Sequence, residues 1–225
     1  MKKLYTGKTK DVYELDDGNI RLVFKDDMTG ADGLFDPGAN TVGLKVEGAG
    51  RAGLAMSVYY FKLLEENGYP THFISADETQ MTVKPVTMFG KGLEVICRYK
   101  ALGSFIRRYG GYIREGEPLE AVVEMTLKDD ERGDPFINED ALIAVGILKT
   151  GEYAKIESLT KKISAIVKAD LAAAGMELCD IKLEFGRDSD DKIMLIDELS
   201  AGNMRVTENG KMITPLELSN RVTGR

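Results

Sequence analysis

DIKLEFG, residues 180–186, is the stretch of sequence that decides the fold, because apolar and charged side chains alternate along it. The odd positions are Ile, Leu and Phe, and the even positions are Asp, Lys and Glu. A period of two is typical of a β-strand with one buried face and one polar face. A turn at residues 186–191 leads to a second apolar run at residues 193–196, so the two runs predict a β-hairpin.

The charged face of this hairpin carries a candidate metal site. Lys182 and Glu184 lie on one face of the first strand, and Asp197 ends the second. Two carboxylates and a lysine at one sheet edge can hold Mg²⁺ on ATP phosphates. A solvated strand face explains these residues equally well, and the register of the hairpin does not follow from the sequence. Both interpretations stay open at this point.

The rest of the chain predicts strands first and mixed structure afterwards. Apolar runs separated by turns indicate strands over residues 4–25, and the glycine-rich stretch 30–53 indicates a loop. Helical spacing predicts helices over residues 54–65, 138–145 and 158–174. This order predicts an α+β fold rather than a regular βαβ array. The turn at residues 90–92 predicts a division into two lobes, residues 1–90 and residues 91–225.

Composition excludes several classes of protein. The 225 residues are 43% hydrophobic and carry a formal net charge of −7, without a dense Lys/Arg run, so we expect no binding to nucleic acid. We expect no membrane span, because no apolar run approaches the roughly 18 residues that one needs. Cys97 and Cys179 lie in strand-like stretches, which favours a reducing compartment. With an N-terminus unlike a signal peptide, these features predict a cytoplasmic protein.

The chain has one histidine, His72, which rules out a zinc site built from several histidines. His72 follows a turn and begins a predicted strand, with no nucleophile motif nearby, so we expect a structural role. A metal, if one is used, should accept oxygen ligands, as Mg²⁺ and Mn²⁺ do.

Three further segments carry residues suited to binding anions. Residues 7–10, Gly-Lys-Thr-Lys, form a glycine turn whose N–H groups and lysines suit phosphate, although a surface hairpin fits as well. In residues 94–104, Arg98 and Ser104 suit a carboxylate or phosphate, and an ion pair between Glu94 and Arg98 is the alternative. Residues 128–139 form a charged loop before a helix, which alone indicates no more than a solvated surface.

Together and in this order, these four segments resemble the SAICAR synthetase family, over residues 4–205. The resemblance implies that ATP drives the joining of the carboxylate of CAIR, an aminoimidazole ribonucleotide, to the amino group of L-aspartate. ADP and phosphate are released, and the route runs through phosphorylation of the carboxylate. The resemblance also implies Mg²⁺, a homodimer, and a two-lobed fold related to ATP-grasp and kinase lobes, with a small β-rich N-terminal lobe.

The resemblance assigns roles to individual residues. The ATP phosphates would contact Gly7, Lys8 and Lys10. Mg²⁺ would bind Glu184 and Asp197. The reacting centre would contain Lys128, Asp134 and Lys182. The anionic groups of the ribonucleotide would contact Arg98, Ser104 and Arg205.

The sequence also departs from the family pattern. After Ser200 the family continues with Pro-Asp, whereas this chain has Ala201-Gly202, and it contains no Trp. The basic C-terminal segment of the family is not recognisable in residues 214–225. These departures leave the acceptor carboxylate open, so a related ATP-dependent amide ligase is an alternative. A non-catalytic nucleotide-binding protein is another, although it would not need to keep both Glu184 and Asp197.

Overall fold

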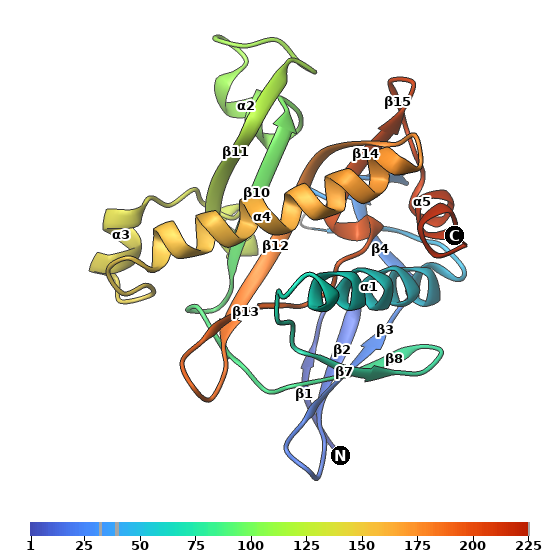
Figure 1. Ribbon diagram of the computed structural model, residues 1–225, viewed down its shortest axis with the longest axis vertical. Helices are drawn as coiled ribbons and strands as arrows, with labels where there is room; N and C mark the ends of the chain where they lie inside the picture. The colour runs from blue at the N-terminus through green and yellow to red at the C-terminus, as the bar shows by residue number, and fades with distance from the viewer. Residues whose placement is uncertain (32, 39–40, 225) are drawn as a thin grey trace.

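The computed structural model describes residues 1–31, 33–38 and 41–224. Two antiparallel sheets form the framework, one in each lobe (Figure 1). The N-terminal sheet has the order β1 (Lys2–Thr6), β2 (Lys10–Glu14), β3 (Ile20–Phe24), β8 (Gln80–Val83) and β7 (Phe73–Ala76). The larger sheet has the order β11 (Pro118–Leu127), β10 (Leu93–Lys100), β12 (Glu177–Arg187), β14 (Met204–Glu208) and β15 (Lys211–Met212), while β9 (Thr87–Met88) and β13 (Ile193–Ile196) also pair with β12.

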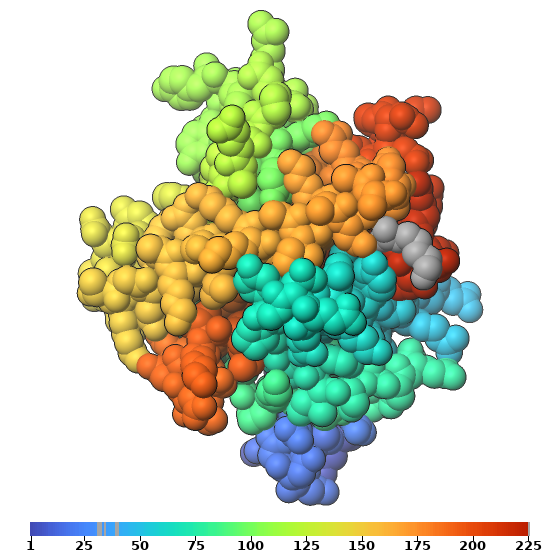
Figure 2. All heavy atoms as spheres, viewed as in Figure 1, coloured from blue at the N-terminus to red at the C-terminus, as the bar shows by residue number. Residues whose placement is uncertain are grey.

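The long helices cover one face of this framework. Helix α4 (Glu152–Ala173) crosses β10 and β12, and α1 (Ala49–Glu66) lies beside it, as Figures 1 and 2 show. The shorter elements are α2 (Ser104–Tyr109), α3 (Glu139–Ala144), α5 (Pro215–Thr223) and the 3₁₀ turns Asp130–Arg132 and Ala201–Asn203. The predicted α+β fold is therefore confirmed.

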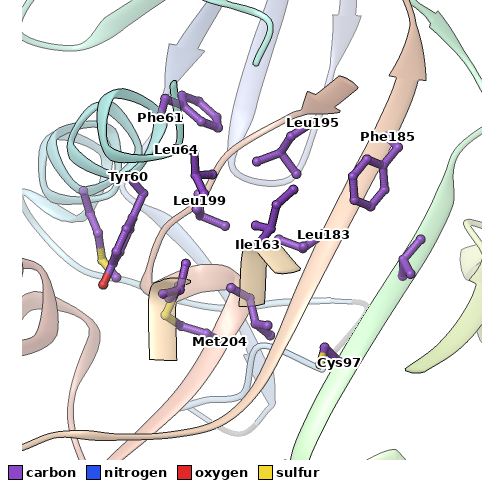
Figure 3. Packing of buried hydrophobic residues seen from close by; sticks show 14 of the residues in the cluster. Tyr60, Phe61, Leu64, Cys97, Ile163, Leu183, Phe185, Leu195, Leu199 and Met204 are labelled. Atoms are coloured by element: carbon purple, nitrogen blue, oxygen red, sulfur yellow. The ribbon is translucent and has the colours of Figure 1, made fainter. Parts of the chain in front are cut away.

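The alternating stretch forms β12 and pairs with β13 as an antiparallel hairpin, with Glu184 opposite Ile196. The apolar face of β12 contributes Leu183 and Phe185 to a core that also holds Ile163 from α4 and Phe61 from α1 (Figure 3). Full burial of such side chains stabilises the fold by roughly 1.5–3 kcal/mol each. The opposite face of β12 is left to carry the charges.

One hydrophobic cluster joins residues from both lobes, since Leu64 and Met81 belong to the same cluster as Leu183 and Leu195. The connection between the lobes contains β9, which pairs with β12. The division of the chain near residue 90 therefore remains a prediction. Cys97 and Cys179 are free and buried in β10 and β12, as the sequence predicts. Within the described part of the chain, no helix has both the length and the hydrophobicity that a membrane span requires.

The glycine-rich stretch 30–53 is not the predicted loop. Its described residues contribute to a small sheet of β5 (Leu34–Phe35), β4 (Asp27–Ala31) and β6 (Val42–Lys45), and to the first turn of α1. Residues 32 and 39–40 of this stretch lie outside the described residues. Helix α1 begins at Ala49, where the Asp26 carboxylate accepts a hydrogen bond from the Gly50 N–H. That contact comes from another element, so the local sequence does not reveal it.

Helix α1 depends on a close approach at Gly50. A Cβ atom added there would lie 2.9 Å from the carbonyl oxygen of Lys25, whereas a Cβ at Gly53 would lie 3.7 Å from the nearest atom, the Cβ of Ser200. The first contact involves backbone that cannot yield cheaply, and the second is ordinary van der Waals contact.

We therefore expect Gly50→Ala to lower the free energy of unfolding by roughly 1–3 kcal/mol. Gly53→Ala, in the same helix, should leave it unchanged or raise it by up to about 1 kcal/mol, because alanine favours a helix over glycine. Urea unfolding followed by circular dichroism measures both. Equal effects of the two substitutions would contradict this account of the close approach.

Candidate active site

A cavity of about 700 Å³ is lined by residues of both lobes. The N-terminal lobe supplies the β1–β2 turn, β3 and the start of α1, and the larger lobe supplies the charged face of β10 and β12 and the end of β13. Of the residues proposed from the sequence, eight line this cavity: Gly7, Lys8, Lys10, Lys128, Asp134, Lys182, Glu184 and Asp197. Three residues, Arg98, Ser104 and Arg205, form a separate cluster.

Strand register brings the carboxylates of the cavity together. Glu94 on β10 lies opposite Glu184 on β12, and Glu184 lies opposite Ile196, which immediately precedes Asp197. Burial and the nearby charge of Asp197 raise the pKa of Glu184. Burial also opposes ionisation of Asp197, but the charges of Lys10 and Lys128 outweigh it and hold the pKa of Asp197 far below its ordinary value.

A lysine is paired with each of these carboxylates. The Nζ atom of Lys10 lies 3.0 Å from Asp197 Oδ1 and 3.0 Å from Glu198 Oε1. Lys128 Nζ lies 2.8 Å from Glu184 Oε1, and Lys182 Nζ lies 2.6 Å from Glu94 Oε1. Burial lowers the pKa of each lysine, but the facing carboxylates outweigh it and the net pKa is raised. All three side chains therefore stay positively charged at neutral pH.

The glycine turn between β1 and β2 closes on its own backbone. The Gly7 N–H donates to the carbonyl of Lys10 at 2.8 Å, and a Cβ at Gly7 would lie only 2.7 Å from that oxygen. Lys25 donates to the Gly7 carbonyl at 2.7 Å, and Lys8 pairs with Asp130 at 2.7 Å. Lys10 is only 8% exposed, so it is not the surface lysine of the alternative interpretation.

Two aspartates of the cavity hold a backbone conformation that is uncommon for a residue with a side chain. The φ angle is +49° at Asp134 and +66° at Asp197. The Asp134 carboxylate accepts a hydrogen bond from the Asp129 N–H, which ties the charged loop to itself. Such conformations often occur at functional sites, and Asp adopts them more readily than most residues.

Arg98, Ser104 and Arg205 come together through buried carboxylates. Arg98 is 1% exposed and donates to Glu124 at 2.6 Å, and Ser104 Oγ lies 2.8 Å from its Nη2. Asp180 Oδ2 accepts from Arg98 at 3.3 Å and from Arg205 at 2.8 Å. The alternative ion pair between Glu94 and Arg98 is wrong, because Lys182 and Thr126 bind the carboxylate of Glu94.

The chain is similar to known proteins over nearly its whole length. The family model described as SAICAR synthetase matches residues 3–215. The phosphoribosylaminoimidazole-succinocarboxamide synthase of Clostridium tetani is 58% identical over 221 residues, which cover 97% of each chain. The chain belongs to the SAICAR synthetase family. The same enzyme of Methanoregula boonei is 40% identical over 208 residues, 91% of this chain and 77% of the relative.

Solved structures of SAICAR synthetases have the same fold. A type-2 SAICAR synthetase in complex with ADP superposes with a TM-score of 0.86 at 33% identity, over 98% of this chain and 97% of the other. The phosphoribosylaminoimidazole-succinocarboxamide synthase of Ehrlichia chaffeensis gives a TM-score of 0.85 at 28% identity, over 99% of this chain and 94% of the other. The predicted family and its two-lobed fold are confirmed.

The oxygen ligands in this cavity suit Mg²⁺. Glu184 and Asp197 offer oxygen ligands, and a cation between them would relieve the repulsion that raises the pKa of Glu184. Among the described residues, no group of three or more His, Cys, Asp or Glu side chains is arranged to hold a metal ion. Two carboxylates are enough for Mg²⁺, which is commonly bound by one or two carboxylates together with substrate phosphates.

His72 supports Asp197 from below. It is 3% exposed, and its Nε2 atom lies 3.0 Å from the Asp197 carbonyl oxygen. A carbonyl can only accept, so Nε2 carries the proton and donates. Burial lowers the pKa of His72 to about 4, even though Asp197 partly opposes this. The predicted structural role agrees with this placement.

The lone imidazole gives a direct measurement. We expect the NMR signal of His72 to titrate near pH 4 instead of near 6.5. A folded pKa below the unfolded one means that the unfolded chain takes up the proton first, so stability falls as pH drops from 6.5 towards 4. Between pH 7 and pH 5 this contribution is about 2 kcal/mol.

A variant without the imidazole, His72→Gln, controls for the acidic groups that titrate in the same range. Its urea stability should fall by about 2 kcal/mol less than that of the wild type over the same pH interval. A midpoint near 6.5 in the wild type, or equal losses in the two proteins, would show that His72 is not buried in its neutral form.

Proposed function

We propose that this SAICAR synthetase uses ATP to join the carboxylate of CAIR to the amino group of L-aspartate, releasing SAICAR, ADP and phosphate. The observation that carries the proposal is the network of Lys10, Lys128, Lys182, Glu184 and Asp197, which all line the cavity between the lobes. It offers cations for phosphate oxygens and carboxylates for Mg²⁺. Similarity to a SAICAR synthetase solved with ADP supports the nucleotide part of the proposal.

The proposed ATP-binding residues form two groups, one that contacts the phosphates and one that would hold Mg²⁺. Gly7, Lys8 and Lys10 bind the phosphates from the N-terminal lobe. Glu184 and Asp197 hold Mg²⁺, which neutralises charge on the phosphate oxygens when it is bound. Lys10 already contacts Asp197, so a nucleotide in the cavity meets a charged group that is in place beforehand.

Lys128, Lys182 and Asp134 lie at the reacting centre. A carboxylate oxygen of the substrate attacks the γ-phosphorus of ATP, and ADP leaves. The amino nitrogen of L-aspartate then attacks the acyl carbon, phosphate leaves with the former carboxylate oxygen, and the nitrogen loses a proton. Because Lys128 and Lys182 stay protonated, they stabilise the negative charge of the phosphoryl group instead of accepting that proton.

The cluster around Arg98, Ser104 and Arg205 binds the anionic groups of the ribonucleotide. Arg205 and Ser104 are partly exposed, whereas Arg98 is buried beneath them. Arg98 therefore positions the residues above it, because its guanidinium donates hydrogen bonds to Ser104 Oγ and to the carboxylate of Asp180. Guanidinium groups suit phosphate because their donors match its oxygens in pairs.

A related ligase with another carboxylate substrate is the second candidate, and Gly202 favours it. A Cβ at Gly202 would lie 3.7 Å from Glu198 Oε1, so an acid in this position would stand beside another carboxylate. The site therefore differs from the family where the resemblance expects an acid. ADP release with CAIR and L-aspartate distinguishes the two ligases. Normal ATP binding without turnover of CAIR would favour the second.

The protein is proposed to act in the cytoplasm as a homodimer. Two free, buried thiols, Cys97 and Cys179, support a reducing compartment. The homodimer rests on the resemblance to the family, and sedimentation equilibrium tests it.

We expect Glu184→Gln and Asp197→Asn each to reduce kcat by roughly a hundredfold to several thousandfold. Each removes a charged metal ligand, which costs roughly 3–5 kcal/mol of transition-state stabilisation. Asp190→Asn, in the exposed turn of the same hairpin, is the matched control and should leave kcat unchanged. Wild-type turnover of both cavity variants at saturating Mg²⁺ would refute the metal assignment.

We expect Lys10→Ala to raise the KM for ATP about tenfold or more, with a smaller effect on the KM for L-aspartate. The cause is the loss of one charge-assisted contact to phosphate, worth roughly 1.5–3 kcal/mol. Lys3→Ala removes an exposed lysine of the neighbouring strand that pairs with Asp11, and neither residue lines the cavity, so this change should leave both constants unchanged. Melting temperatures show whether each variant is folded. An unchanged KM for ATP in Lys10→Ala would exclude this loop from the nucleotide site.

A further inference from the structure

The guanidinium of Arg205 is packed closely against two glycines, Gly103 and Gly38. A Cβ at Gly103 would lie 2.8 Å from its Nη2 atom and 3.0 Å from its Cζ and Nη1 atoms. A Cβ at Gly38 would lie 2.9 Å from Nη2. Gly103 has a φ angle of +55°, which few other residues adopt. The chain thus leaves space for this guanidinium in one position, between segments from the two lobes.

Two carboxylates bind Arg205 in this position, and they differ in how far they are exposed. Asp180 is buried and shared with Arg98, so it is a fixed part of the cluster. Asp36 is less firmly held than Asp180, because its side chain is 42% exposed. It contacts Arg205 from the connection between β5 and β6. Asp36 Oδ1 lies 2.6 Å from Arg205 Nη2 and also accepts from the Gly38 N–H at 2.9 Å.

The groups around Asp36 are positively charged or donate hydrogen bonds, so this position suits an anion. Burial opposes its ionisation, but the Gly38 N–H and the charges of Arg205 and Arg107 outweigh this and lower the pKa of Asp36. Arg107 is exposed on α2, and among the described residues it acts on Asp36 through its charge without forming an ion pair. The neighbours of Asp36 in the sequence, Phe35 and Pro37, line the cavity. The exposed side of Arg205 is therefore occupied by a carboxylate at the edge of the substrate space.

We propose that Asp36 occupies, in the ligand-free protein, the position on Arg205 that the phosphate group of the acceptor substrate takes, so that this substrate binds by displacing Asp36. The inference rests on the proposed function, which assigns Arg205 to the anionic groups of the ribonucleotide. Phosphate can replace a single carboxylate because it offers more oxygens and up to two charges to the same guanidinium. Asp36 then sets the affinity for a phosphorylated acceptor without contacting ATP.

Replacing Asp36 by Asn tests the proposal, because it keeps the shape and removes the competing charge. Calorimetric titration with ribose 5-phosphate, a probe that needs no turnover, should show binding about threefold to tenfold tighter in Asp36→Asn than in the wild type. The KM for CAIR in the ADP-release assay should fall by a similar factor, and the KM for ATP should stay the same. Asp17→Asn makes the same change in net charge in a remote turn and should alter neither.

A double-mutant cycle with Arg205→Met locates the effect. If Asp36 acts through Arg205, the gain from Asp36→Asn disappears in the Arg205→Met background. Unchanged or weaker ribose 5-phosphate binding in Asp36→Asn, or no binding to either protein, would overturn the proposal. A raised KM for L-aspartate would also overturn it, because Asp36 would then bind the substrate amine.

These measurements test the role of Asp36 and the identity of the acceptor substrate separately. Turnover of CAIR with unchanged affinities in Asp36→Asn would leave the proposed function standing and remove the role of Asp36. Tighter ribose 5-phosphate binding without turnover of CAIR would keep the displacement of Asp36 and remove CAIR as the acceptor.

Discussion

The buried pairing of Lys10 with Asp197 and Glu198 is the interaction on which the rest of the structure depends, because it joins the two lobes across the cavity. Lys10 belongs to β2 of the N-terminal sheet, and the carboxylates follow β13 of the larger sheet. A buried charge without a partner costs several kcal/mol, so neither lobe can place its half of the network without the other. The cavity therefore exists only where the lobes meet, and its chemistry is set by both.

Similar pairs keep the other ionised groups of the cavity compensated. Lys128, which directly follows β11, compensates Glu184, and Lys182 compensates Glu94, so each of these carboxylates on the charged face of β10 and β12 has a lysine partner. Under the proposed function, a nucleotide bound with Mg²⁺ would bring both negative and positive charge to these pairs. It can exchange these internal pairs for pairs with phosphate and metal while few buried charges are left alone. This explains how a site with so many ionised groups stays folded before substrate arrives.

The sequence predicts the parts of this site that depend on local pattern. The alternation in residues 180–186 predicts the strand, its hairpin and the shared face of Lys182 and Glu184, because period and turn are local properties. It does not predict that Glu94 pairs with Lys182, since strand register is set by contacts far apart in the chain. For the same reason the contact between Asp36 and Arg205 does not follow from the sequence, and the helical spacing predicts a start of α1 later than Ala49. Asp180 and Glu198 are not among the site residues proposed from the sequence. The available signals are that Asp180 shares the charged positions of Lys182 and Glu184 and that Glu198 directly follows Asp197.

Several glycines of the chain have a role other than forming turns. In the sequence, glycines indicate turns, and on that basis the stretch 30–53 predicts a loop. In the structure, several glycines instead mark places where a charged side chain lies against backbone. Gly38 and Gly103 flank the guanidinium of Arg205, and Gly53 and Gly202 approach the carboxylate of Glu198. A side chain at Gly38 or Gly103 would compete for the space that the guanidinium of Arg205 occupies, whereas one at Gly53 or Gly202 would lie at an ordinary van der Waals distance from Glu198. The position of a charged group therefore explains glycine at two of these positions.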